Sequence, residues 1–297
     1  MKGHAFAGYH PVVNFLYFAL ILSFSMIFMH PVCLLISFIA ALIYSITLKG
    51  KKAVRFSVVY LLPLLFITAL VNPAFNHEGA TILTYLKSGN PLTLESITYG
   101  IAAATMLAAV ICWFSCFNEI MTTDKLVYLF GRIIPSLSLI LSMVLRFVPR
   151  FKVQIKHISN GQKGIGRDIS NGSMVQRVKH GIKILSIMVT WALENAIETA
   201  DSMKSRGYGL SGRTAFSLFR FDQRDKKALM SILLMGLYII IGAMSGGLSF
   251  RYFPTMKGSS LDLYTGSIFL SYLMLCLIPV WIDKEEEKRW HSLQSKI

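Results

Sequence analysis

Six long apolar stretches constrain the fold of this chain more than any other feature of its sequence. A helix needs roughly 17 to 25 residues to cross about 30 Å of hydrocarbon, and each stretch has about that length. They cover residues 12–29, 31–48, 56–72, 97–117, 228–246 and 264–282. A hydrophobic content of 54% and a mean hydropathy of +0.55 agree with this pattern. We therefore expect an all-α, polytopic membrane bundle of about six spans.

Prolines mark several boundaries of these spans. Pro11 begins the first, Pro31 separates the first from the second, and Asn72-Pro73 is expected to end the third. The segment 73–95 then mixes Gly, Pro and Asn with short β-prone runs, which predicts an ordered external hairpin or a re-entrant loop.

The charge distribution predicts the orientation. Lys and Arg number 30 against 15 Asp and Glu, a net charge of +15. With both termini in the cytoplasm, only Lys87, Arg251 and Lys257 lie outside, as the positive-inside rule favours. Nucleic acid is not an expected partner, because aromatic residues do not interleave with the basic ones between 146 and 183.

Between the fourth and fifth spans lies a long polar insertion. We expect three parts: an N-terminal membrane bundle (1–117), a cytoplasmic helical region (118–226), and C-terminal spans with a cytoplasmic tail (227–297). Pro135 suits the first turn of a helix over about 136–162, and nearby glycines end it. A second helix over about 175–204 completes a predicted helical hairpin.

The end of the second helix carries charged residues in a regular pattern. Glu194, Glu198 and Asp201 share one stripe, which predicts either ion pairs with the basic first helix or a charged docking face. Arg206 and Gly207 follow. A cation and a left-handed glycine suit a helix C-terminus, so structural capping is an alternative to function for both residues.

Several motifs are set aside. The Gly207, Gly209, Gly212 pattern has no preceding strand, and the glycines from Gly161 lack the Lys and Ser or Thr of a nucleotide-binding loop. The four cysteines lie in apolar runs without the spacing of a metal site. We expect no cofactor, no metal and no catalytic residue.

The residues from Leu193 to Gly209, followed by Arg213-Thr214, resemble the transmembrane T component (EcfT/CbiQ-like) of energy-coupling factor (ECF) transporters. The likeness extends back through Arg146-Phe147-Val148-Pro149 and Gln162-Lys163. Asn72-Pro73-Ala74-Phe75-Asn76-His77 and Gly89-Asn90-Pro91-Leu92-Thr93 in the N-terminal part look similar to the same family.

The resemblance implies an importer of a vitamin or metal ion in a bacterial plasma membrane. In such a transporter, two ABC-type ATPase subunits dock on the cytoplasmic helices of the T component. A substrate-binding S component packs on the other face, and the T component itself, surrounded by membrane lipid, hydrolyses nothing. Specificity belongs to the S component, so the substrate is not readable from this chain.

The resemblance also assigns roles to residues. Two short motifs with a central arginine dock the ATPases, and Ser205-Arg206-Gly207 matches the second. The first aligns with Gly164-Ile165-Gly166, which has Ile165 in place of the arginine, flanked by Lys163 and Arg167. The residues that we expect to support the coupling helices are Arg146, Pro149, Gln162, Glu194, Glu198 and Asp201.

A second hypothesis is a membrane-embedded enzyme with acidic residues at the membrane surface. Glu194, Glu198 and Asp201 form the one acidic cluster available to it. No histidine is spaced to join them, since His157 and His180 are isolated, so an enzyme is the less favoured hypothesis.

Overall fold

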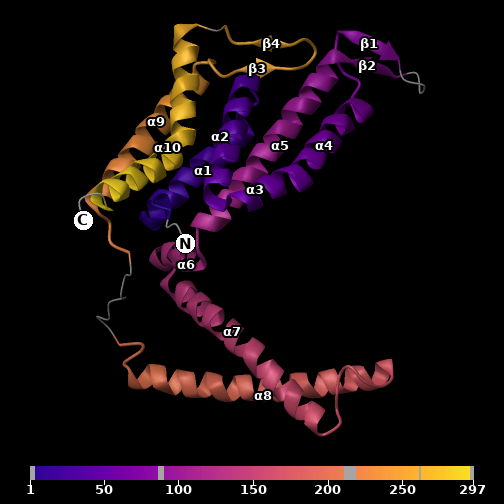
Figure 1. Cartoon of the computed structure of the whole chain (residues 1–297), viewed down its shortest axis with the longest axis vertical. Helices are drawn as coiled ribbons and strands as arrows, with labels where there is room; N and C mark the ends of the chain where they lie inside the picture. The colour runs from indigo at the N-terminus through magenta and orange to yellow at the C-terminus, as the bar shows by residue number, and fades with distance from the viewer. Residues whose placement is uncertain (1–3, 86–89, 211–218, 261, 295–297) are drawn as a thin grey trace. The chain divides into compact units, whose positions relative to one another are not determined.

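The described part of the chain is mostly helical, which confirms the predicted all-α class. The computed structural model describes residues 4–85, 90–210, 219–260 and 262–294 (Figure 1). Its contacts group into two compact units: unit 1 comprises Met1–Leu126 and Phe219–Ile297, and unit 2 comprises Val127–Leu218. The three-part division at 117 and 226 stays a prediction.

Unit 1 contains the apolar helices and two short hairpins. Its elements are η1 (Phe6–Gly8), α1 (Pro11–Ile27), α2 (Pro31–Lys49), α3 (Lys51–Phe56), η2 (Ser57–Leu61), α4 (Leu62–Phe75), β1 (Ile82–Tyr85), β2 (Pro91–Thr93), α5 (Leu94–Ile120), α9 (Gln223–Met244), β3 (Phe250–Arg251), β4 (Lys257–Gly258) and α10 (Leu263–Gln294). Helix α6 (Thr123–Ile133) begins in unit 1 and continues into unit 2, which contains α7 (Pro135–Gly164) and α8 (Met174–Ser205).

Five helical stretches of the described chain are long and apolar enough to cross a membrane. They are Pro31–Lys49, Lys51–Phe75, Leu94–Ile120, Gln223–Met244 and Leu263–Trp290. The remaining predicted span corresponds to α1, which is apolar but has 17 residues, the short end of the spanning range. The prediction of about six spans therefore resolves into five long helices and one shorter one.

The third span differs in detail from its prediction. It is a continuous helical stretch from Lys51 to Phe75 in which α3, η2 and α4 follow one another without a loop. Asn72-Pro73 does not end it, because Pro73 lies inside the last turn of α4 and the helix closes at Asn76. A proline is tolerated there because only one backbone hydrogen bond near the helix end is lost.

Aromatic and small residues from four helices form the core of unit 1. Trp113 of α5 is fully buried, and its indole N–H donates to Ser37 Oγ of α2 at 3.0 Å. Ser37 Oγ lies 2.6 Å from Ser25 Oγ of α1, and Ser25 Oγ lies 3.4 Å from Tyr272 OH of α10. Buried polar groups need partners, and this chain of contacts provides them where four helices meet.

Within the segment 73–95, two short strands form a hairpin, which is one of the two predicted alternatives. Strands β1 and β2 pair antiparallel, with Ile82 opposite Thr93 and Tyr85 opposite Pro91, and its tip at 86–89 lies outside the described residues. Thr81 anchors the hairpin by donating its amide and hydroxyl to the buried Glu95 carboxylate. A second short pair, β3 with β4, follows α9.

Glycine at position 100 sets the distance between α4 and α5. A Cβ atom there would lie 2.6 Å from Ala69 O and 3.2 Å from the Asn72 Cβ and Pro73 Cδ atoms. Backbone atoms of a packed helix cannot yield cheaply, so any side chain at this position must push the two helices apart.

We predict that Gly100→Ala lowers the free energy of unfolding by about 1–3 kcal/mol through overpacking. Gly266→Ala in α10 is the matched control, because a Cβ at Gly266 meets no atom within 4 Å. That change should be neutral, or stabilising by about 0.5–1 kcal/mol through the better helix propensity of alanine. Thermal unfolding in detergent measures both. Equal melting temperatures for the two variants would contradict the close approach of α4 and α5.

Candidate functional site

The two long helices of unit 2 carry nearly all the residues singled out from the sequence. Pro135 occupies the first turn of α7, as predicted. Ser173 begins α8 with a capping box: its hydroxyl accepts from the Gln176 amide, and the Gln176 side chain accepts from the Ser173 amide. Both helices therefore start at residues whose chemistry favours a helix N-terminus.

The helices cross; they do not lie alongside one another as the predicted hairpin implies. Figure 1 shows α7 passing over α8. The contact is aromatic: the rings of Phe151 and Trp191 meet edge to face with centroids 5.7 Å apart, and Phe147 stacks on Phe151 at 5.9 Å. Trp191 lies well inside α8, so long segments of both helices extend on each side of the crossing.

Helix α8 ends in a Schellman motif built around Gly207. The Gly207 amide donates to Lys204 O at 2.9 Å, and the Tyr208 amide donates to Met203 O at 2.9 Å. Gly207 has a φ of 78°, the left-handed conformation that glycine adopts without steric cost. Arg206 is the last residue before this glycine, and it is exposed.

Helix α7 ends in the same motif around Gly166. The Gly166 amide donates to Lys163 O at 3.0 Å, the Arg167 amide donates to Gln162 O at 2.9 Å, and the φ of Gly166 is 80°. Ile165 therefore holds the position in α7 that Arg206 holds in α8, and its side chain is 63% exposed. The two triplets that were aligned by sequence have equivalent backbone geometry.

The two cations that flank Ile165 have different surroundings. Lys163 Nζ lies 3.3 Å from the Asp168 carboxylate. Hydrogen bonds from the Ser170 hydroxyl and amide, together with Lys163, lower the pKa of the Asp168 carboxyl to about 2, so this carboxylate remains charged at physiological pH. Arg167 is exposed, and its side chain has no hydrogen bond or ion pair with the described residues. The Lys163 side chain is itself 67% exposed, so the two cations differ in their partners and not in their access to solvent.

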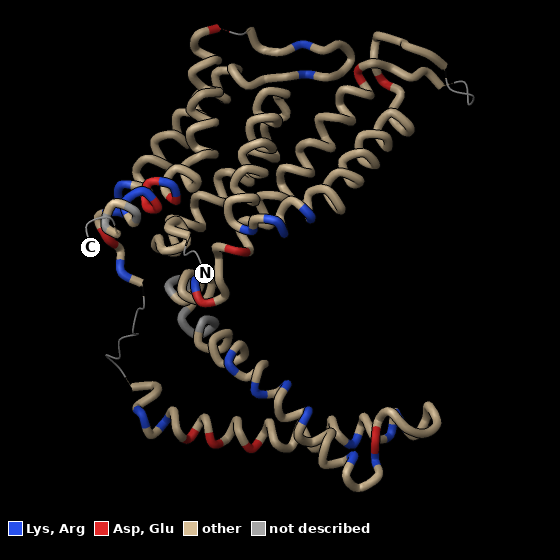
Figure 2. The backbone as a smooth tube through the Cα atoms, in the orientation of Figure 1, with Lys and Arg blue, Asp and Glu red and all other residues tan. Residues whose placement is uncertain are grey.

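The acidic stripe of α8 is exposed. Glu194, Glu198 and Asp201 make no ion pair within 4.0 Å to any described residue, so the interhelical ion pairs considered from the sequence are not formed. The two helices meet through the rings of Phe151 and Trp191, and the three carboxylates occupy exposed positions of α8 beyond that contact. Figure 2 shows Lys and Arg along α7 and the first half of α8, and acidic residues along the second half of α8.

The remaining predicted residues lie along α7. Arg146 and Pro149 are exposed, and Pro149 stands inside the helix, where it provides no amide for Leu145 O. The Gln162 carbonyl accepts the Arg167 amide in the terminal motif. Gly161, expected to help break the helix, lies within α7, which ends at Gly164. Gly212, Arg213 and Thr214 lie outside the described residues.

One surface was missed in the sequence reasoning. Along α8 a stripe of apolar side chains is 51–65% exposed: Val175, Val178, Ile182, Leu185, Val189, Leu193 and Ile197. Their spacing of three and four residues places them on neighbouring positions of one helical face, and that spacing was the available signal. An exposed apolar stripe of this length indicates a surface that a partner or the membrane covers.

No group of three or more His, Cys, Asp or Glu side chains among the described residues is close enough to hold an ion. His77, in the segment before β1, lies beside the amide of Asn90 at 3.1 Å.

Comparisons with known proteins agree with the resemblance. The model of a family described as a cobalt transport protein (CbiQ) matches residues 7–216. The energy-coupling factor transporter transmembrane protein EcfT of Lactococcus lactis is 34% identical over 106 residues, which are 35% of this chain and 40% of that protein. EcfT of Lactobacillus helveticus is 35% identical over 109 residues, 36% of this chain and 39% of that protein.

A third relative, EcfT of Staphylococcus aureus, is 32% identical over 111 residues, 37% of this chain and 41% of that protein. The chain spans about two fifths of the length of these curated relatives. The likeness to EcfT and CbiQ chains predicted from the sequence is confirmed, and with it the assignment to membrane transport.

The glycine at the end of α8 gives a testable consequence. We predict that Gly207→Ala destabilises the last turn by about 1–2 kcal/mol, because alanine pays the steric cost of a left-handed residue. Gly207→Asn should cost less, since asparagine tolerates that conformation. Hydrogen exchange of the amides at 207 and 208 reports the loss.

Gly161→Ala provides the control, because Gly161 lies inside α7 and a Cβ there meets nothing within 4 Å. Its exchange pattern at 207 and 208 should match the unmodified chain. Unchanged exchange in Gly207→Ala would exclude the Schellman motif as the end of α8.

Proposed function

This chain belongs to the cobalt transport protein family, and from that premise we propose that it is the transmembrane coupling (T) subunit of an ECF importer. In this role it transmits ATP-driven motion from two ATPase subunits to a substrate-binding S component, for uptake of a vitamin or a metal ion. The observation that carries the proposal is the pair of equivalent helix ends at Gly164-Ile165-Gly166 and Ser205-Arg206-Gly207.

The end of α8 suits insertion into a groove of a partner. Arg206 is exposed at a helix end whose backbone is fixed by two hydrogen bonds, so the backbone needs little further ordering when the residue binds. A guanidinium presents five donors in a planar fork, which match carboxylate and carbonyl oxygens. The exposed Glu194, Glu198 and Asp201 add an acidic face to the same helix half, available to cations of the ATPase.

The end of α7 docks the second ATPase with a displaced cation. Ile165 takes the arginine position and contributes apolar contact, while Arg167, two residues later, supplies the guanidinium. Lys163 supports the loop by its contact with Asp168 and is not the docking residue. The two ATPases are therefore held by the same backbone motif and by different side chains.

The apolar stripe of α8 is the surface that we assign to the S component. Seven exposed aliphatic side chains between Val175 and Ile197 would be costly to leave in water. An S component that is itself a membrane protein offers apolar helices to cover them. A stripe along α8 then responds directly to movement at its end, where Arg206 meets the ATPase.

For the orientation we propose a bacterial plasma membrane with both termini in the cytoplasm. Arg251 of β3 and Lys257 of β4 follow the C-terminal end of α9, whereas Arg224 lies near its N-terminal end. Lys49, Lys51, Lys52 and Arg55 lie where α2 ends and α3 begins. Figure 2 shows more Lys and Arg at one end of the apolar helices of unit 1 than at the other. Such a bias is the usual mark of the cytoplasmic side.

The alternative of a membrane-embedded enzyme has less support. Its acidic residues, Glu194, Glu198 and Asp201, are exposed on a helix face and lie in no enclosed site of the described chain. General acid–base chemistry needs a partner group and a sheltered pocket. ATP hydrolysis accordingly belongs to the partner ATPases, and no cofactor of this chain is proposed.

The first prediction from this proposal concerns Arg206. Arg206→Ala should weaken binding of the ATPases by roughly 30-fold or more, because loss of a buried charge-assisted contact costs at least about 2 kcal/mol. Copurification from membranes of cells that coexpress the chain, its ATPases and its S component measures binding. ATP-dependent uptake of tritiated vitamins and of radioactive Co²⁺ measures transport.

Lys204→Ala is the matched control, since Lys204 is an exposed cation of the same helix turn. It should retain the ATPases and uptake. If Arg206→Ala behaves like Lys204→Ala, Arg206 is a helix-terminal residue without a docking role.

The second prediction separates the cations of α7. In an Arg206→Ala background, Arg167→Ala should abolish the remaining copurification of ATPases, and Lys163→Ala should leave most of it. Adding Ile165→Arg to the Arg167→Ala variant should restore binding, because it places a guanidinium at the position equivalent to Arg206. A loss with Lys163→Ala that equals the loss with Arg167→Ala would refute this assignment.

A further inference from the structure

The chain passes between unit 1 and unit 2 at two places only. It leaves unit 1 after Leu126, early in α6, and returns at Phe219, shortly before α9. Covalent transmission of movement from the coupling helices to the membrane bundle must pass through these two places. The residues of unit 1 that hold them are therefore candidates for positioning residues.

Lys125 lies at the first of these connections, next to Leu126. Its side chain is buried, and its Nζ donates to Ala7 O and to Ile120 O, the latter at 3.1 Å. With the Asn14 amide turned so that its oxygen faces Lys125, that oxygen accepts at 2.8 Å and the amide nitrogen donates to Phe6 O at 3.1 Å. In that orientation all three ammonium protons have acceptors, and Ile120 O belongs to the negative C-terminal end of α5.

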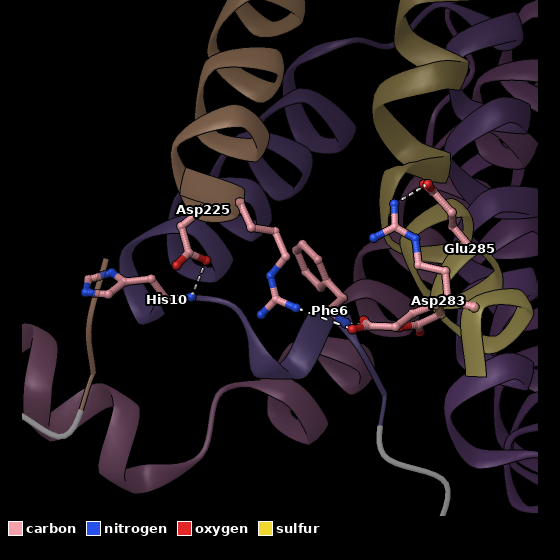
Figure 3. A network of polar contacts seen from close by, with 8 residues as sticks. Phe6, His10, Asp225, Asp283 and Glu285 are labelled. Atoms are coloured by element: carbon pink, nitrogen blue, oxygen red, sulfur yellow. Dashed lines mark hydrogen bonds and ion pairs between the residues drawn. The ribbon is translucent and has the colours of Figure 1, made fainter. Parts of the chain in front are cut away.

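Asp225 lies near the second connection, in the first turn of α9. One carboxylate oxygen accepts the Asp222 amide at 3.0 Å and completes the capping box that begins α9. The other accepts the amide of His10 at 3.0 Å, although the two residues are 215 positions apart (Figure 3). Next to it, the Phe221 ring meets the His10 ring edge to face at 5.1 Å, and the Arg224 guanidinium lies 4.4 Å above the Tyr9 ring.

One segment, residues 4–10, therefore contacts the residues at both connections: Lys125 in α6 and Asp225 in α9. We call this segment the strap. Its other contacts fix it to the bundle. The Phe6 amide donates to Asp283 Oδ1 of α10 at 3.0 Å (Figure 3). The fully buried Phe6 ring packs against Tyr17 of α1, with ring centroids 5.2 Å apart. Arg224 adds an ion pair to Glu286 of α10 at 3.4 Å.

The charges argue against a purely stabilising role. Lys125 and Asp225 are 6% and 3% exposed, and burial lowers the pKa of Lys125 because it penalises the ammonium form. Apolar side chains of similar size often stabilise a protein at least as well as buried charges. Hydrogen-bonded charges instead fix one geometry, because every alternative leaves a buried charge unpaired.

We propose that the strap is a mechanical joint, in which Lys125 and Asp225 are positioning residues that make α6 and α9 follow the coupling helices together. The proposal rests on the coupling function proposed above. In this joint, movement of α6 is carried through residues 7–10 to the start of α9. Helix α9 then carries it to Met244 at its far end.

The test uses the full complex with its ATPases in lipid nanodiscs. Met244→Cys places a reactive thiol on a side chain that is 84% exposed, whereas the four natural cysteines are buried. The rate of its reaction with a water-soluble maleimide is measured without nucleotide and with ATP plus vanadate. We expect a nucleotide-dependent difference in the otherwise unmodified chain, and its loss in Lys125→Met and in Asp225→Asn while the ATPases stay bound.

Lys49→Met is the matched control. Lys49 Nζ also binds the C-terminal part of α5, donating to Ser115 O at 2.9 Å, but it does not contact the strap. This variant should keep the nucleotide-dependent difference. If the strap variants keep it too, or if Lys49→Met loses it equally, the strap is only a structural element and the proposal is wrong.

Arg224→Ala covers the case in which the variants of the buried charges fail to fold. The Arg224 side chain is 48% exposed, and its removal leaves Lys125 and Asp225 in place. A reduced nucleotide response is expected, and an unchanged response overturns the strap. Failure of the unmodified chain to bind ATPases contradicts the coupling function itself, whereas a bound complex with intact responses in all strap variants contradicts the strap alone.

Discussion

The rest of this structure depends on the requirement that backbone amides and carbonyls find partners wherever water is excluded. Inside hydrocarbon the helix meets this requirement by itself, so the apolar segments of unit 1 are helices. Helix ends do not meet it, and there the chain uses specific residues. Gly166 and Gly207 close α7 and α8 by left-handed turns, while Lys125 binds the last carbonyl of α5. The candidate functional residues accordingly gather at helix ends.

Local chemistry explains what could be predicted from the sequence. Apolar length gave the positions of the spans, Pro135 and Pro31 gave helix starts, and Gly207 gave a helix end, because each effect acts within a few residues. The crossing of α7 and α8 could not be predicted, since it depends on a ring contact between Phe151 and Trp191. The place of the third span's end was wrong because the Asn72-Pro73 pair packs against Gly100 as part of α4.

The C-terminal ends of α7 and α8 have the same backbone geometry and different side chains. Their hydrogen bonds are equivalent, yet Ile165 stands where α8 has Arg206. Sequence comparison alone leaves Lys163 and Arg167 as equal candidates to replace the arginine. The contact between Lys163 and Asp168 distinguishes them, because an ammonium engaged by a neighbouring carboxylate must break that contact before it binds a partner. Such engagement favours the flanking guanidinium, whose side chain needs no rearrangement among the described residues.

Lys125 and Asp225 have no pattern in the sequence that marks them. Lys125 stands in an amphipathic helix, where a lysine is normally solvated, and Asp225 looks like a third-position capping residue. Each nevertheless uses a part of its hydrogen-bonding capacity on residues 7–10, more than a hundred positions away. To cap α9, Asp225 needs one carboxylate oxygen only. A solvated lysine would need neither of the backbone contacts that Lys125 makes. The second set of bonds therefore connects both chain passages between unit 1 and unit 2 to residues 7–10, which capping alone does not require.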